Sequence, residues 1–112
     1  MKIRWYDWWP WHAWRVIGSV DAADEIPKHL PRTAIVVVGP LESPKWIAFD
    51  CPCREGHRVL LPAARTASPR WSLVGQERTT LSPSIDAWHT ATQRCHYFIR
   101  QGHVEWVRHP TP

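Results

Sequence analysis

The amino-acid sequence predicts a mainly β fold, in a single small domain of short antiparallel strands. Eleven prolines among 112 residues argue against long helices, because each proline fixes φ and removes a backbone donor. Short β-branched and aromatic runs are separated by glycine and proline, as in strands that are joined by turns. Cys51 and Cys53 open a segment that predicts a zinc knuckle, although Cys-x-Cys is a weaker signal than two Cys-x-x-Cys pairs, and a domain this small often needs such a metal staple.

The first half of the chain predicts an arm followed by strands. Residues 1–14 contain five of the nine tryptophans and keep neither a helical nor a strand period, so we expect a Trp-rich N-terminal arm. Its rings either pack on the domain or form a partner-binding patch. Residues 15–20 are β-prone, and residues 21–31 predict a loop with one helical turn. Residues 33–39 form a β-branched run that predicts a strand buried on both faces, and residues 45–50 predict the next strand.

The second half predicts further short strands and two hairpins. Gly75-Gln76 and Gln101-Gly102 mark the two tight turns. Residues 82–92 predict a longer loop. The predicted strands cover residues 58–61, 70–74, 77–81, 97–100 and 103–108. We therefore expect residues 15–109 to form a single zinc-stapled β domain that ends in a tail, residues 110–112.

The segment that begins at Cys51 carries metal-ligating residue types at regular spacing. Cys51, Cys53, Glu55 and His57 share one parity, so their side chains leave the same face if the segment is extended. Thiolate and imidazole are the ligands that Zn²⁺ prefers in a closed structural site. Cys95 is the natural distant ligand, and it would tie the C-terminal hairpin to this segment. The sequence therefore predicts structural zinc.

The fourth metal ligand stays open on spacing alone. His57 is the first choice, and Glu55 and His96 are the alternatives. Cys95 and His96 are adjacent, so their side chains point to opposite faces if the segment is a strand. If Cys95 holds the metal, His96 is directed elsewhere and is held rigidly beside the site. The competing interpretation is that the three cysteines are reduced thiols that fill the core.

Ser84 and His96 are the candidate catalytic residues. A serine hydroxyl is a poor nucleophile until a base takes its proton, and histidine is the usual base at neutral pH. The two residues lie 12 positions apart and flank the predicted loop, so they can meet. Asp86 could orient the imidazole, and main-chain N–H groups near Ser84 could form an oxyanion hole. Alternatively, Ser84 is a turn serine with a local backbone hydrogen bond, and His96 is a ligand or a packed ring.

Charge and hydropathy restrict the class of protein. The formal net charge is +4, and no Lys/Arg run occurs, so a nucleic-acid footprint is not indicated. No apolar run approaches the roughly 20 residues of a membrane span, and no apolar segment with a cleavage site opens the chain. We expect a cytoplasmic protein whose cysteines are reduced and free to bind metal.

Four sequence blocks together resemble a known family. They are Cys51-x-Cys53-x-x-Gly56, Trp71-x-Leu73, Leu81-x-Pro83-Ser84-Ile85 and His96-Tyr97-Phe98-Ile99-x-x-Gly102-x-Val104-x-Trp106. The blocks resemble a small bacterial family long described only as a domain of unknown function. Its genes lie beside those for ubiquitin-like proteins, an E1-like adenylating enzyme and an E2-like protein. The resemblance covers about residues 16 to 106.

The resemblance implies a zinc-supported domain that acts in bacterial ubiquitin-like conjugation. The implied activity is that of a serine-type peptidase, or deubiquitinase, with Ser84 as the nucleophile and His96 as the general base. The implied partners are a ubiquitin-like protein and, beyond it, E1-like and E2-like proteins. In the family, cysteines stand at the positions of Glu55 and Gln93, and His57 and Cys95 would replace them here. The alternative is a non-catalytic zinc-binding adaptor for the same partners.

Overall fold

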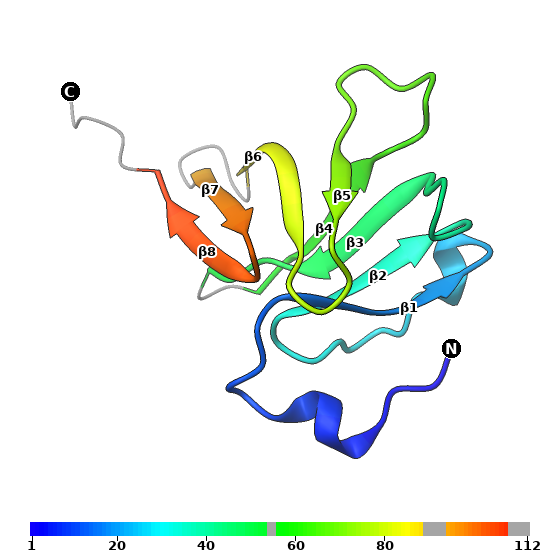
Figure 1. Ribbon diagram of the computed structural model, residues 1–112, viewed down its shortest axis with the longest axis vertical. Coiled ribbons are helices and arrows are strands. Elements are labelled where there is room, and N and C mark those ends of the chain that lie inside the picture. Colours follow the sequence, from blue (N-terminus) through cyan, green and yellow to red (C-terminus); the bar gives the residue numbers. More distant parts are fainter. Residues whose placement is uncertain (54–55, 89–93, 108–112) are drawn as a thin grey trace.

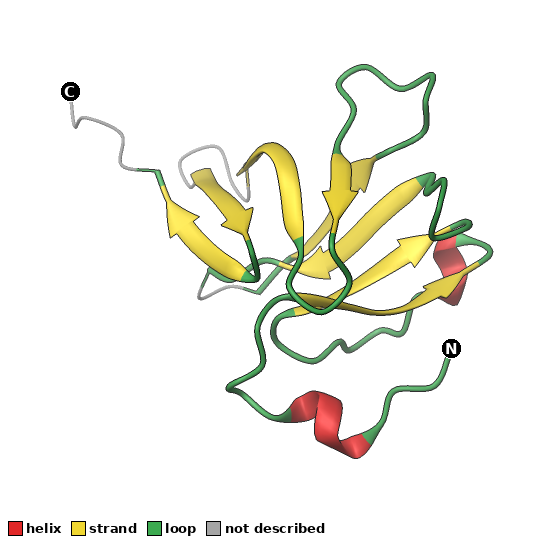
Figure 2. Cartoon of the chain, in the orientation of Figure 1, coloured by secondary structure: helices red, strands yellow, loops and turns green. Residues whose placement is uncertain are grey.

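The computed structural model describes residues 1–53, 56–88 and 94–107, and it confirms the mainly β fold (Figure 1). Its described strands form two four-stranded sheets (Figure 2). Sheet A has the strand order β1-β2-β3-β4, with the strands Arg15–Val20, Ala34–Val38, Trp46–Asp50 and Arg58–Pro62. Sheet B has the order β5-β6-β7-β8, with the strands Ser72–Val74, Thr80–Trp88, Arg94–Arg100 and His103–Trp106.

Strand β2 is buried along its whole length, as its uninterrupted β-branched run predicts. Ile35 joins the core between the sheets. Val36 and Val38 join a second cluster on the other face of sheet A, together with Val20 and Leu30. This double burial explains why the run lacks the polar alternation of a half-exposed strand.

Strand β1 pairs with β2 in parallel, which differs from the expected antiparallel arrangement. Every other strand pair in the two sheets is antiparallel. A parallel pair needs a crossover between its strands, and residues 21–33 provide that connection. The connection contains the 3-10 turn η2, Ala23–Glu25, where one helical turn was predicted. No helix among the described residues is long and apolar enough to span a membrane.

The prediction of a loop over residues 82–92 is wrong for its described part. Strand β6 continues without a break from Thr80 to Trp88, so Ser84 lies within a strand. Pro83 favoured the loop assignment because proline cannot donate to a sheet ladder. The structure tolerates it because the strand is irregular at this point. Residues 89–93 lie outside the described part of the chain.

The hairpin of β7 and β8 confirms the predicted turn at Gln101-Gly102. Both turn residues have positive φ, 49° and 82°. Two such residues in a two-residue loop form the turn that matches the twist of the flanking strands. The register that this turn sets places Cys95, Tyr97 and Ile99 in buried positions, whereas His96 is half-buried.

The main core lies between the two sheets. Sheet A contributes Ile47 and Phe49, and sheet B contributes Ile85 and Tyr97. Trp14, the last residue of the predicted arm, packs edge-on against Phe49, with ring centroids 5.4 Å apart. The end of the arm is therefore part of the core of the domain.

The arm itself, residues 1–14, runs below sheet A in the view of Figure 1 and contains the 3-10 turn η1, Trp5–Trp8. It is held by Arg15, whose guanidinium donates to the Asp7 carbonyl oxygen at 2.9 Å and lies 3.5 Å from the Asp7 carboxylate. Trp5 and Trp11 are nevertheless 73% and 71% exposed. The arm thus combines a part that packs on the domain with exposed rings, and its role in partner binding stays a prediction.

Candidate active site and metal centre

Ser84 lies in a bulge of β6. Leu81 pairs with Ile99 and Ile85 pairs with Tyr97, so four steps along β6 face two steps along β7. The extra residues of β6 lie outside the regular pairing around Ser84, and bulges of this kind change the direction of side chains. Because Ile85 points into the core, the alternation of the strand places Ser84 on the outer face of sheet B.

The Ser84 hydroxyl and the His96 imidazole are in hydrogen-bond contact. Ser84 Oγ lies 2.9 Å from His96 Nε2, and both residues are half-buried. His96 is directed to this outer face because its neighbours on β7, Cys95 and Tyr97, point into the core. With the ring proton on Nδ1, Nε2 accepts from the hydroxyl. That geometry allows histidine to take the serine proton.

Asp86 lies beside this pair. It is directly opposite His96 in the register of β6 and β7, so the two side chains emerge on the same face of sheet B. The Asp86 carboxylate forms an ion pair with Arg94, whose Nε lies 2.6 Å from Oδ1 and whose terminal nitrogen contacts Oδ2. The structure thus brings Asp86 next to the imidazole while Arg94 holds its carboxylate. A role for Asp86 in orienting His96 stays a prediction.

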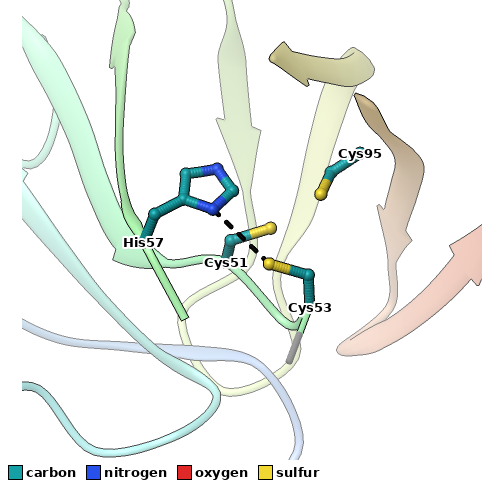
Figure 3. A group of neighbouring side chains, drawn as sticks. All are labelled: Cys51, Cys53, His57 and Cys95. Carbon is teal, nitrogen blue, oxygen red and sulfur yellow. Dashed lines mark hydrogen bonds between the residues drawn. The ribbon is translucent and has the colours of Figure 1, made fainter. Parts of the chain in front are cut away.

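Three cysteines and one histidine meet on the other side of sheet B (Figure 3). The ligating atoms of Cys51, Cys53, His57 and Cys95 all lie within 4.8 Å of one another. His57 Nδ1 is 3.4 Å from the Cys53 sulfur, and the three thiols form no disulfide. The four residues therefore lie close enough to bind a metal ion.

The loop between β3 and β4 supplies three of these ligands. The Cys51 N–H donates to the His57 carbonyl oxygen at 2.8 Å and closes the loop. The Gly56 N–H donates to the Cys53 carbonyl oxygen at 3.2 Å, and Gly56 has a φ of 60°. The segment is thus turned, so the condition of an extended segment, on which the shared face depended, is not met. The side chains converge because the turn folds His57 back toward the cysteines.

The fourth cluster member is His57, the first choice from the sequence. His96, one alternative, contacts Ser84 on the opposite face of sheet B. Glu55, the other alternative, and Gln93 lie outside the described residues. Cys95 comes from β7 and faces the loop of sheet A, as Figure 3 shows. The cluster therefore joins the two sheets.

Burial dominates the electrostatics of the cluster. Desolvation, with a hydrogen bond to Cys53, raises the pKa of the Cys95 thiol to about 12. Desolvation likewise raises the pKa of Cys51 and of Tyr97, whose hydroxyl donates to the Cys51 sulfur at 3.5 Å. Neutral thiols are thus favoured, and a bound cation would reverse this preference because metal ligands are thiolates.

A comparison with protein-family models identifies the family of the chain. A family model described as "Bacterial ubiquitination-like system serine protease (BubE)" matches residues 22–107. The chain belongs to the BubE family. The match includes the Ser84–His96 pair and the Cys/His cluster, and it confirms the resemblance that the sequence indicated. The comparison with curated proteins and the comparison with solved structures each gave no match.

The BubE match excludes the arm, because it begins at residue 22. It includes one contact to the candidate nucleophile that sequence reasoning missed. The Trp71 indole N–H donates to the Ser84 carbonyl oxygen at 3.3 Å. Trp71 was part of a recognised block, but spacing along the chain gives no signal that residues 13 positions apart are bonded in this way.

Proposed function

We propose that this member of the BubE family is a serine peptidase that processes or removes a bacterial ubiquitin-like modifier. Ser84 is the nucleophile and His96 is the general base. The 2.9 Å contact between Ser84 Oγ and His96 Nε2 carries the proposal, because a base in this position activates a serine hydroxyl. The family description, a serine protease of a ubiquitination-like system, names the same chemistry.

The proposed reaction is acyl transfer followed by hydrolysis. His96 Nε2 takes the Ser84 proton while Oγ attacks the carbonyl carbon of the scissile amide. The C–N bond then breaks, and the leaving amine receives the proton from His96. Water next attacks the carbonyl carbon of the Ser84 ester while His96 takes its proton. The bond from the acyl carbon to Ser84 Oγ then breaks, the acyl group leaves as a carboxylic acid, and His96 returns the proton to Oγ. We assign to Asp86 the orientation of the imidazole and to main-chain N–H groups near Ser84 the stabilisation of the oxyanion.

We further propose that the Cys/His cluster binds zinc in a structural role. Three thiolates and an imidazole form a ligand set that zinc prefers. Tetrahedral zinc with Zn–S bonds of about 2.3 Å separates its ligand atoms by about 3.8 Å. The observed separations, all within 4.8 Å, need little adjustment to reach that arrangement. Four protein ligands leave no open position, so the metal would stabilise the fold while Ser84 and His96 do the chemistry.

Fluorophosphonate labelling tests the activated pair. Such probes react with serines that a base has made nucleophilic. We expect one adduct by intact mass, located at Ser84 by peptide mapping and lost in His96→Ala. The matched control is His103→Ala, an exposed histidine of β8, which should keep the adduct. An adduct that survives in His96→Ala, or no adduct on the folded wild type, would contradict the assignment.

The exposed rings of the arm favour a second candidate function, a non-catalytic adaptor. Trp5 and Trp11 present large apolar surfaces, which are enriched at protein interfaces. An adaptor would bind a ubiquitin-like protein or an E2-like partner through them. Trp5→Ala and Trp11→Ala would then weaken that binding at least tenfold, about 1.4 kcal/mol in calorimetry. Unchanged affinity would exclude this use of the arm.

A further inference from the structure

Trp71 connects the candidate nucleophile to the body of the protein. Its indole N–H donates to the Ser84 carbonyl oxygen at 3.3 Å. Its own backbone N–H donates at 2.9 Å to the carbonyl oxygen of Pro62, the last residue of β4. The ring packs, partly buried, against the core between the sheets. Trp71 therefore joins sheet A to the bulge of sheet B.

The bulge needs such a contact. Strand β5 pairs with β6 only as far as Ser82, and the regular pairing of β6 with β7 resumes at Ile85. Ser84 lies between these two points, where the register shifts. A half-buried carbonyl group in this irregular stretch is stabilised by a donor. The Trp71 indole is that donor, so it fixes the peptide plane that carries the nucleophile.

We propose that Trp71 is a positioning residue of the peptidase: its indole N–H holds the Ser84 carbonyl and keeps Ser84 Oγ within reach of His96 Nε2. The inference rests on the proposed function, because it assigns Trp71 a role in that chemistry. Indole is a donor only, so phenylalanine removes the hydrogen bond while keeping an aromatic ring. A small displacement of a reacting group lowers the rate of the chemical step more than it lowers binding.

The test is Trp71→Phe, assayed on a fusion of a ubiquitin-like protein to a C-terminal reporter peptide. We expect kcat to fall about tenfold while KM changes less than about twofold. Hydrogen exchange of the peptide that contains residues 81–85 should increase, and exchange of β2 should not. The matched control is Trp46→Phe, the same change at a partly exposed tryptophan of β3. It should leave kcat, KM and the exchange of residues 81–85 unchanged.

A second variant separates the hydrogen bond from packing. Replacing Trp71 by benzothienylalanine keeps the shape of the ring and replaces the N–H by sulfur. The same fall in kcat in this variant supports the positioning role, and a wild-type kcat overturns it. Ser84→Ala is assayed in parallel. Cleavage by Ser84→Ala would refute the proposed serine mechanism itself, whereas an inactive Ser84→Ala beside a fully active Trp71 variant would refute only the role of Trp71.

Discussion

Cys95 and His96 are neighbours on β7, yet they serve opposite sides of sheet B. Cys95 is buried and meets Cys51, Cys53 and His57 in a cluster that joins the two sheets. His96 is half-buried and contacts Ser84 on the outer face. The alternation of a strand separates the two environments by a single residue. Under the proposed function, stability depends on one of two adjacent side chains and chemistry on the other, so substitutions can test the two roles separately.

The largest effect is expected on the buried side. Cys95→Ser removes the one cluster member that comes from sheet B, so we expect loss of the proposed zinc and a melting temperature lower by at least about 10 °C. Elemental analysis and calorimetry measure the two losses. Ser82→Ala, at an exposed residue of β6, is the control and should change neither. A Cys95→Ser protein with full metal content would contradict the cluster assignment.

On the outer face of sheet B, a substitution should reduce activity and leave stability nearly unchanged. His96→Ala should lower kcat/KM by about a thousandfold or more, because Ser84 would lose its proposed base. The melting temperature should change by less than about 2 °C, since the ring lies outside the core. Cleavage assays and calorimetry on the same preparation separate the two effects. A large loss of stability would mean that His96 also supports the fold, and the contrast with Cys95 would fail.

The pH dependence of stability is a third test, made on the metal-free protein. Burial raises the pKa of Cys95 from 9.0 to about 12. As the pH rises, the Cys95 thiol loses its proton in the unfolded chain before it does so in the folded protein. The contribution of Cys95 to stability is therefore complete below about pH 9 and is lost as the pH rises toward about 12. Chelated protein should therefore melt at a lower temperature at about pH 10 than at about pH 8. Metal-loaded protein should instead lose stability in acid, where protons displace the metal. If the chelated protein melts at the same temperature at both pH values, the raised pKa of Cys95 is refuted.

The smallest effect is expected at Asp86. Asp86→Asn removes the charge that pairs with Arg94, and an ion pair this exposed contributes little to stability. If Asp86 also orients the imidazole, kcat should fall while KM stays constant. The control is Glu105→Gln, which breaks the exposed ion pair with Arg100 on the same sheet. Identical kinetics in the two variants would remove Asp86 from the catalytic group.

Part of this arrangement was predictable from local sequence patterns. The buried strand β2 follows from an unbroken β-branched run, and the β7–β8 hairpin follows from Gln101-Gly102. The opposite directions of Cys95 and His96 follow from strand parity alone. These features depend on neighbouring residues, so the sequence is sufficient to predict them.

Other features depend on contacts between distant segments. Pro83 indicated a loop, but pairing with β7 keeps Ser84 in a bulged strand. The choice of His57 over His96 as cluster member depends on how the β3–β4 loop turns toward sheet B, which spacing cannot show. The Trp71 contact likewise requires the two sheets to be packed together. Tertiary structure decides these points.

The origin of the four cluster residues has a consequence for the order of folding. Cys51, Cys53 and His57 belong to one short loop, whose closure involves only local chain motion. Cys95 follows Cys51 by 44 residues, and it lies near the loop because sheet B packs on sheet A. An ion captured early would be bound by the three ligands of this loop, and the fourth ligand would complete the site late. Metal binding would therefore stabilise the docked sheets after the last folding step, and its main kinetic effect would be to slow unfolding.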